Sequence, residues 1–390
     1  MKEIVLLTRD EVFINMFRRR MNPEKFVLYS FNDQQKVHAW LASHKSVELF
    51  ILDVSIGNYN ESMLDYIKQT YPNIIRMTLN DLRTTCENHM PAFEGIAQLN
   101  LNKTHSATEI WSLVDKVFDI DSKLKNRELM SLMSTLKNIP TIPNIYFELS
   151  HMIRNNASVE DIADKLESDP AISSNIIKMA NTAFYNANTG SIRQAIMFIG
   201  LINVKNIILT NAVFGNTGID PKIRDIHWKH VRLTNKILNA LYVELLGKKL
   251  NNNIASVGLL HDIGSVVMMA NYPVEFKKIV EWEQTTQTGH ISMLEKEIVG
   301  FSHEELGGYL LDLWGFPVPV VEAALMHHDP LNPMVINREL VLAVHLANYF
   351  AWEVMDYDLY HKPINEDVVS ALAISDDKLE QFVENLKTIV

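Results

Sequence analysis

The order of the apolar segments constrains the fold of the first 120 residues most strongly. Five short runs rich in Ile, Val and Leu alternate with polar segments that are each long enough for a helix. The runs are Ile4–Leu7, Phe26–Tyr29, Leu49–Val54, Ile74–Thr78 and Ile96–Leu101. Runs that are apolar at consecutive positions are typical of strands buried on both faces of a parallel sheet. The sequence therefore predicts a three-layer α/β domain over residues 1–121.

Three polar residues stand where the strands of this domain are expected to end. Asp53 closes the third strand, Thr78 closes the fourth, and Lys103 follows the fifth. In a parallel sheet, ligands and chemistry gather at the carboxyl ends of the strands. This pattern resembles the receiver domains of response regulators, over about residues 1–121. The resemblance implies a flavodoxin-like fold with a five-stranded parallel sheet, and it makes Asp53 a candidate phosphoacceptor contacted by Thr78 and Lys103.

The segment after the first strand departs from the receiver pattern. Receiver domains hold magnesium there with two acidic residues, and the alignment places Thr8 and Arg9 at those positions. Phosphoryl transfer to a carboxylate needs a cation that neutralises the developing charge. We therefore expect a degenerate receiver. Two interpretations of Asp53 remain open: a phosphoacceptor, or a strand-end carboxylate that pairs with Arg9 or Lys103.

Beyond Thr104 the apolar period changes from that of a sheet to that of a helix. Apolar residues recur every three or four positions, which predicts one long or broken helix over Thr108–Lys137. Its residues 122–137 are the expected linker, and its apolar stripe makes residues 108–137 our candidate homodimer contact. Further on, helix-capping patterns predict an all-helical region; they begin at Ser158, Asp169 and Ser302.

Histidines are the candidate chemistry of the helical region. Eight of the chain's 14 lie between His227 and His345, and the pair His261-Asp262 stands in an otherwise apolar segment. Polar groups buried in such a segment need partners. Imidazoles and a carboxylate that converge from several helices form a common kind of divalent metal site. We expect His230, His303, His327 and His328 to supply its other groups.

Several ordered motifs make residues 130–375 resemble the HDOD domains. The motifs are Asn138-Ile-Pro-Thr-Ile-Pro143, Asp169-Pro-Ala-Ile, Lys178-Met-Ala-Asn-Thr-Ala183, Ala195-Ile-Met-Phe-Ile-Gly200, Gly258-Leu-Leu-His-Asp-Ile-Gly264, His303-Glu-Glu-Leu-Gly307 and Trp314-Gly-Phe-Pro317. HDOD domains are a branch of the HD superfamily of metal-dependent phosphohydrolases, found mostly in bacterial signalling proteins. The resemblance implies an all-α HDOD domain over 138–390, with an N-terminal helical part (138–220) and an HD-like part (221–390).

The resemblance to catalytic HD enzymes implies a ligand set for a divalent metal such as Mn, Fe, Ni or Zn. The matching positions are His230, His261, Asp262, His303, His327, His328 and Asn348. Asn348 replaces an aspartate, so it can offer an oxygen but no charge. Ser265 stands where cyclic-dinucleotide-cleaving relatives have lysine, and no Gly-Tyr-Pro follows His328. We therefore do not expect cleavage of cyclic di-GMP. His227, His290 and His345 match no motif position, and we expect structural or surface roles for them.

The amino-acid composition limits which partners and which cellular compartment we expect. The net charge of −11 lacks the excess of basic residues that attracts nucleic acid. Cys86 is the chain's single cysteine, which excludes an internal disulfide and suits the reducing cytoplasm. No apolar stretch approaches the ~20 residues of a membrane span. We expect a cytoplasmic protein whose partners are signalling proteins.

Two functions are compatible with these features. The first is a bacterial signal-transduction regulator, in which the receiver-like domain is coupled to a noncatalytic HDOD output domain that acts through protein contacts. The alternative is an HD-type metal-dependent phosphohydrolase that acts on a phosphoester or nucleotide, with His261 and Asp262 in the catalytic centre. The clustered histidines favour the hydrolase, whereas Asn348, Ser265 and the usual association of HDOD domains with signalling favour the regulator, which we expect.

Overall fold

The computed structural model describes the 390-residue chain except for residues 55–60, 82–96, 126–135, 137–138, 141, 155, 183–186, 216–217, 252–253, 287–290, 356–363 and 390. The chain divides into two compact units. The first, here called the sheet unit, contains Met1–Asp121 and Gly315–Val318. The second, here called the helical unit, contains Ser122–Trp314 and Pro319–Val390.

The sheet unit contains a five-stranded parallel sheet, as the alternating apolar runs predict. Its strand order is β2-β1-β3-β4-β5, the flavodoxin-like order of doubly wound folds. The strands are β1 (Lys2–Leu7), β2 (Phe26–Phe31), β3 (Val47–Asp53), β4 (Ile75–Asn80) and β5 (Leu99–Asn102). The helices are α1 (Glu11–Arg20), α2 (Gln34–Ser43), α3 (Glu61–Thr70) and α4 (Ala107–Leu124).

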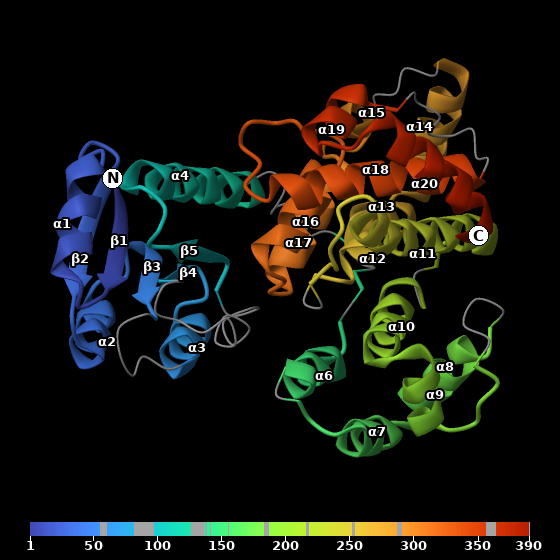
Figure 1. Ribbon diagram of the computed structural model, residues 1–390, viewed down its shortest axis with the longest axis horizontal. Coiled ribbons are helices and arrows are strands. Elements are labelled where there is room, and N and C mark those ends of the chain that lie inside the picture. Colours follow the sequence, from blue (N-terminus) through green and yellow to red (C-terminus); the bar gives the residue numbers. More distant parts are fainter. Residues whose placement is uncertain are drawn as a thin grey trace. The chain divides into compact units, whose positions relative to one another are not determined.

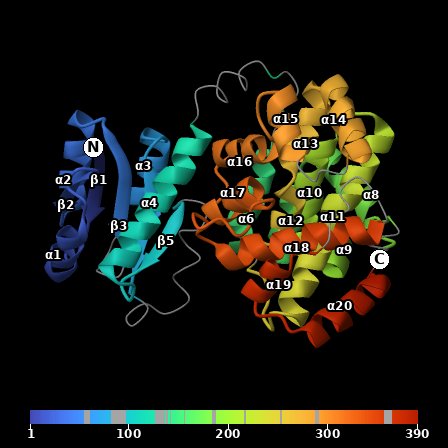
Figure 2. The same cartoon turned by 90° about the horizontal axis from the view of Figure 1, so that it is seen from above.

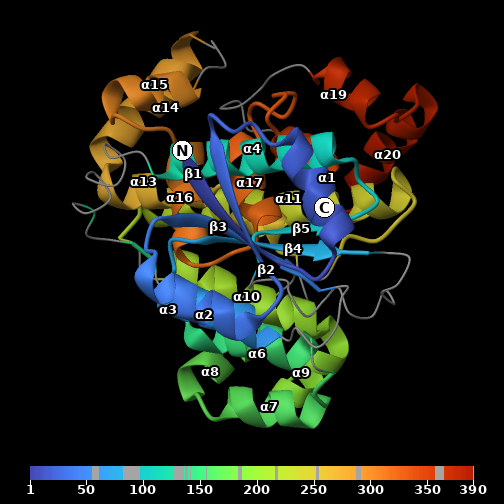
Figure 3. The same cartoon turned by 90° about the vertical axis from the view of Figure 1, so that its left-hand side faces the viewer.

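Helices cover both faces of this sheet, which explains why its central strands are apolar at consecutive positions. Val5 and Phe50 face one side, where they pack in a cluster with Val37 of α2 and Leu64 of α3. On the other side α1 and α4 meet, and the ring of Trp111 stacks 4.2 Å from that of Phe17. In Figure 3, α2 and α3 lie below the sheet, and α1 and α4 lie above it. Figure 2 shows the same layers from above.

The described residues of the helical unit form helices joined by turns and loops, and none of them forms a strand (Figure 1). They are α6 (Asn144–Arg154), α7 (Val159–Glu167), α8 (Pro170–Ala180), α9 (Ile192–Ile199), α10 (Leu201–Phe214), α11 (Pro221–Glu244), α12 (Val257–Leu260), α13 (Ile263–Asn271), α14 (Pro273–Thr286), α15 (Ile291–Ile298), α16 (His303–Leu313), α17 (Val318–Met326), α18 (Arg338–Met355), α19 (Glu366–Ala371) and α20 (Asp376–Ile389).

The predicted capping residues begin their helices. The side chain of Ser158 accepts from the backbone N–H of Asp161, and Asp169 caps α8 with Pro170 at its first position. Ser302 forms a complete capping box with Glu305. By contrast, α4 ends at Leu124. Most of the linker predicted beyond it, residues 126–135 and 137, lies outside the described residues, so the homodimer contact stays a prediction.

Two glycines allow α12 and α13 to lie directly against their neighbours. A Cβ atom on Gly258 would stand 2.5 Å from the Cα of Asn235 in α11. A Cβ atom on Gly264 would stand 1.8 Å from the carbonyl oxygen of His303, at the start of α16. No side chain fits at either distance, because heavy atoms in contact stay ~3.5 Å apart. These contacts bring the His261-Asp262 pair between α11 and α16.

None of the described helices is by itself long and apolar enough to cross a membrane. The pair α9 and α10 reaches the required length and apolarity only when joined across a bend of 111°.

Candidate functional site

The strand-end carboxylate of the sheet unit is neutralised by the protein itself. Asp53 is fully buried. Its Oδ2 lies 2.8 Å from Nζ of Lys103 and accepts a hydrogen bond from the hydroxyl of Thr8 at 2.5 Å. Lys103 also lies 3.1 Å from Oδ2 of Asp10. Of the two proposed partners of Asp53, the structure therefore brings Lys103 into contact with it.

The other predicted residues of this strand end behave differently. The hydroxyl of Thr78 donates to Oδ1 of Asn100 at 2.5 Å, and Arg9 is exposed. Asp10 accepts from the backbone N–H of Phe13 and so caps α1. Burial raises the pKa of Asp10, but the Phe13 N–H and the Lys103 ammonium outweigh it and hold that pKa below its ordinary value. The segment after β1 thus offers a hydroxyl and a capping carboxylate where a receiver offers two metal ligands.

The helical unit brings together all seven residues predicted as metal ligands. His230 comes from α11, and His261 and Asp262 stand between α12 and α13. The others come from the start of α16, from the end of α17 and from α18; they are His303, His327, His328 and Asn348. All are buried except His328, which is half-buried. We call these seven residues the histidine cluster.

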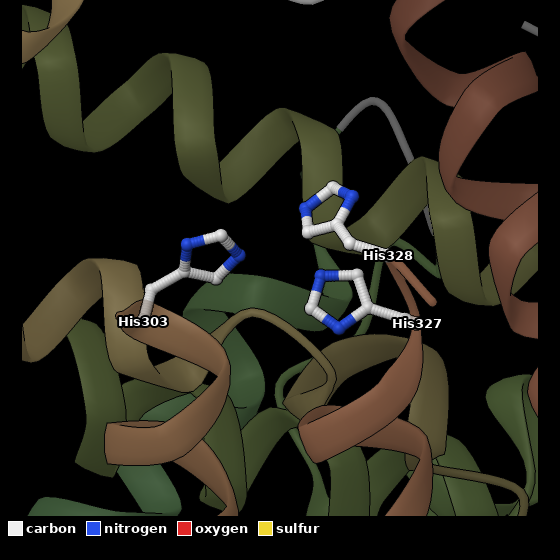
Figure 4. Close-up of side chains that lie close together, drawn as sticks. All are labelled: His303, His327 and His328. Carbon is white, nitrogen blue, oxygen red and sulfur yellow. The ribbon is translucent and has the colours of Figure 1, made fainter. Parts of the chain in front are cut away.

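Ring spacings show that the cluster is continuous. The centroid of the His261 ring lies 5.5 Å from that of His230 and 5.0 Å from that of His327. The His327 ring lies 5.4 Å from that of His303 and 4.2 Å from that of His328. Figure 4 shows the rings of His303, His327 and His328 turned toward one another. Five helices or helix ends therefore converge on one polar centre inside an apolar core.

Backbone carbonyls fix the tautomers of two of these histidines. Nδ1 of His261 lies 2.9 Å from the carbonyl oxygen of Gly258, and Nδ1 of His327 lies 2.8 Å from that of Ala324. A carbonyl only accepts, so Nδ1 carries the proton and Nε2 presents a lone pair. Burial lowers the pKa of both imidazoles, which keeps them neutral. This is the arrangement by which proteins orient metal-binding histidines.

His303 has the opposite charge state. Its Nδ1 lies 2.7 Å from Oε2 of Glu295 and 3.5 Å from Oε2 of Glu304, and both carboxylates are buried. Burial lowers the pKa of His303, but these two carboxylates outweigh it and raise that pKa to about 10. In this state His303 is an imidazolium, and its positive charge faces the carboxylates of Glu295 and Glu304.

Asp262 is the one carboxylate among the seven predicted ligands. Its Oδ1 accepts from the hydroxyl of Ser265 and lies 3.8 Å from Nε2 of His303. Its Oδ2 lies 3.7 Å from Nδ1 of His227. Burial raises the pKa of Asp262, but His227 and His303 outweigh it and hold that pKa well below its ordinary value. The residue is therefore an ionised carboxylate.

The donor atoms of the cluster fit a divalent cation. Nδ1 of His230 is buried without a hydrogen-bond partner. Nε2 of His261 lies 3.2 Å from the side-chain amide of Asn348. Ligand atoms of His230, His261 and Asp262 lie within 4.8 Å of one another, as do those of His303, His327 and His328. The neutral imidazoles of His230, His261 and His327 with the carboxylate of Asp262 are a suitable donor set for the metals expected from the sequence, whereas His303 would join them only after losing its proton.

Some residues of this site could not be assigned from motifs. His227 is buried beside Asp262, and its position three residues before His230 on one helix was the available signal. Glu304 follows His303 within the motif His303-Glu-Glu-Leu-Gly307, whereas Glu295 gave no such signal, because only the tertiary fold brings it to His303. His345 contacts the carbonyl oxygen of His327 through Nδ1 at 2.7 Å. His290 lies outside the described residues.

Comparison with known proteins agrees with the helical fold. The family model described as HDOD domain matches residues 139–330. A Treponema pallidum (strain Nichols) protein that is itself uncharacterized is 23% identical over 268 residues, which is 66% of this chain and 51% of that protein. The chain thus spans about half the length of this curated relative.

Three solved structures illustrate the similarity of the fold. An HDOD domain protein of unknown function from Geobacter sulfurreducens is 22% identical, with a TM-score of 0.52 over 70% of this chain and 99% of that one. A Marinobacter aquaeolei VT8 protein, provisionally named a signal transduction protein, is 16% identical, with a TM-score of 0.56 over 85% of this chain and 83% of that one. A Shewanella amazonensis SB2B protein, provisionally named a phosphohydrolase, is 20% identical, with a TM-score of 0.50 over 68% of this chain and 95% of that one.

The family match and the convergence of its motif residues at one centre lead to the same assignment. The chain contains an HDOD domain at residues 139–330, within its helical unit.

Proposed function

We propose that this protein is a signal-transduction regulator in which the sheet unit, as a degenerate receiver, is coupled to a noncatalytic HDOD output domain. The observation that carries the proposal is the charge balance of the histidine cluster. Asn348 contributes no charge, and the two nearby glutamates, Glu295 and Glu304, face the imidazolium of His303. Among the seven residues of the histidine cluster, Asp262 alone carries a negative charge, and a hydrolytic metal centre depends on charged ligands and their orienting partners.

The sheet unit supports the same proposal. Thr8, which stands where the receiver pattern has an acidic residue, donates its hydroxyl hydrogen to Asp53 and cannot supply a charged magnesium ligand. In this proposal the sheet unit receives its input through protein contacts, and the HDOD domain passes it on to other signalling proteins. Neither nucleic acid nor a membrane is a partner.

Complementation of a deletion strain tests the noncatalytic role. The wild-type gene and an Asp262→Asn variant, which keeps the shape of the side chain, are each returned to the strain, and transcript profiles are compared. We expect both to restore the wild-type profile, because signalling by contact does not need the Asp262 charge. If a folded Asp262→Asn variant behaves like the deletion, the noncatalytic proposal fails.

A metal-dependent phosphohydrolase is the second candidate, and the fixed tautomers of His261 and His327 favour it. A bound divalent metal would supply an activated water and polarise a phosphoryl oxygen. His230, His261, His327 and Asp262 would hold the metal, and Glu295 would orient His303. The surrounding core would exclude bulk water.

Elemental analysis of protein purified without chelator tests this second candidate. The parent is compared with a His261→Ala, Asp262→Ala double variant whose folding is checked by circular dichroism. Near-stoichiometric Mn, Fe, Ni or Zn in the parent and none in the variant would support it and justify a screen of phosphoesters. Absence of metal from both folded proteins would eliminate it.

A further inference from the structure

A cavity of about 540 Å³ lies in the helical unit, away from the histidine cluster. Its walls come from α8, α10, α11 and α12, together with Lys249, Leu250 and Ala255. None of the seven cluster residues lines it. Its volume is in the range of ~300–1,000 Å³ that small-molecule sites occupy.

The charge of the cavity is opposite to that of the chain. Arg232 and Lys236 of α11 line it together with Lys249, and none of its described lining residues is acidic. The chain as a whole carries 47 acidic and 36 basic residues. Arg232 is half-buried, and Lys236 and Lys249 are exposed; cations that converge on a concave surface attract anions. Arginine and lysine are also the usual partners of phosphate.

Asparagine side chains supply directional polar groups beside these cations. Oδ1 of Asn235 is buried without a hydrogen-bond partner, which is costly unless a ligand donates to it. The NH₂ groups of Asn203 and Asn239 donate to backbone carbonyls at 2.6 and 2.7 Å, bonds that do not use their amide oxygens. The amide oxygen of Asn206 accepts from the hydroxyl of Ser256 at 2.5 Å.

The remaining walls are aromatic and apolar. The half-buried ring of Trp228 lies 5.4 Å from the guanidinium carbon of Arg232. Ile207 and Leu259 add apolar surface. An indole beside a guanidinium and apolar surface suits a flat heterocycle, because stacking on such groups tolerates any π-face. Inorganic phosphate would use neither this surface nor the acceptor oxygens.

We propose that this cavity is a nucleotide-binding site. Arg232, Lys236 and Lys249 meet the phosphate, the acceptor oxygens of the asparagines receive N–H donors of the base, and Trp228 packs against its ring. The inference does not depend on the proposed function, because it concerns binding at a place separate from the histidine cluster. Such a nucleotide-binding site is compatible with a regulator and with a hydrolase.

Calorimetric titration of the full chain tests the ligand class. The probes are AMP, GMP and cyclic AMP, and the controls are adenosine, ribose 5-phosphate and inorganic phosphate. We expect at least one nucleotide to bind about tenfold or more tightly than each control, because a charge-assisted hydrogen bond contributes roughly a factor of ten or more. Absence of nucleotide binding at millimolar concentration would overturn the proposal. If inorganic phosphate bound as tightly as the nucleotides, the cavity would be only an anion site, and the proposal would be overturned as well.

Two adjacent lysines provide a matched test of location. Lys249 lines the cavity, whereas Lys248 pairs with Glu339 at 2.6 Å and does not line it. Both are exposed, so either can be replaced by glutamine without loss of fold. Lys249→Gln should weaken nucleotide binding by about tenfold, and Lys248→Gln should leave it nearly unchanged. Equal effects of the two variants would place the nucleotide elsewhere.

Discussion

The two units of this protein each bury a carboxylate at the centre of a predicted site, and they neutralise it in different ways. Asp53 in the sheet unit contacts the ammonium of Lys103 at 2.8 Å. Asp262 in the helical unit accepts from a serine and faces imidazoles at 3.7 and 3.8 Å. A lysine is a fixed counter-ion at physiological pH, whereas an imidazole exchanges its proton or takes a metal in its place.

This difference shows why similar sequence evidence supports different functions in the two units. The Asp53 site is complete without any added ion, so it is suited to structure or to protein recognition. The histidine cluster contains an unpartnered Nδ1 on His230, and Nε2 of His261 and of His327 carries no proton. It is therefore suited to accept a cation. The predictions below test this contrast, from the largest expected effect to the smallest.

Lys103→Met should break the Asp53 site with the largest effect. Removing one partner of a buried ion pair leaves an uncompensated charge and costs about 3–5 kcal/mol in the free energy of unfolding. Chemical denaturation followed by circular dichroism measures it. Adding Asp53→Asn to the same chain should recover much of the loss. The matched control is Lys25→Met, whose exposed ion pair with Asp115 at 3.5 Å should contribute less than about 1 kcal/mol; equal losses would contradict the contrast.

A divalent metal should stabilise the helical unit and not the sheet unit. At a hundredfold excess over its Kd, a ligand that binds only the folded state adds about 2.7 kcal/mol. Thermal denaturation with and without Mn²⁺ or Zn²⁺ measures the shift. The shift should survive Asp53→Asn and disappear in the His261→Ala, Asp262→Ala variant. A shift that is lost with Asp53→Asn would assign the metal to the sheet unit.

Gly258→Ala should destabilise the helical unit by about 1–3 kcal/mol, the usual cost of overpacking. The added Cβ would meet the backbone of Asn235 at 2.5 Å, and backbone atoms cannot turn aside as a side chain would. Gly190→Ala is the control, since its Cβ would meet nothing within 4 Å. The two unfolding free energies, measured by urea denaturation, should differ; if they are equal, the helix contact is not tight.

Asp10→Ala should cost about 1 kcal/mol at neutral pH, because the cap of α1 is lost. The pKa of Asp10 is lowered in the folded state from its ordinary value of 3.8. Its ionised form therefore adds stability above about pH 4, and this contribution is lost as the pH falls through the lowered pKa. Unfolding free energies at neutral pH and near pH 3 should show the difference between the two proteins shrinking in acid. A constant difference would show that the Asp10 charge contributes nothing.

Much of the fold follows from local sequence patterns. Apolar runs located the five strands, and capping residues such as Ser302 located helix starts, because both depend on neighbours in the chain. The expectation that residues at the carboxyl ends of parallel strands lie close together also predicted the contact between Asp53 and Lys103. It did not foresee that Thr78 would donate to Asn100, since the side-chain register between β4 and β5 decides that contact.

The helical site was only partly accessible from sequence. Motif positions gave its seven residues, but not the counter-charges that set their protonation. Glu295 comes from α15 and reaches His303 across a tertiary contact, so no spacing along the chain reports it. The cavity was missed for the same reason, because its cations and asparagines are scattered over α10, α11 and the segment before α12.

Gly258 connects the two sites of the helical unit. Its missing side chain lets α12 lie on Asn235, which lines the cavity, and its carbonyl oxygen fixes the tautomer of His261 in the cluster. A ligand that displaced α12 from α11 would therefore alter the lone pair that His261 offers to a cation. Thermodynamic reciprocity then sets a strict condition: whatever factor a nucleotide imposes on the affinity for a metal, the metal must impose the same factor on the affinity for the nucleotide.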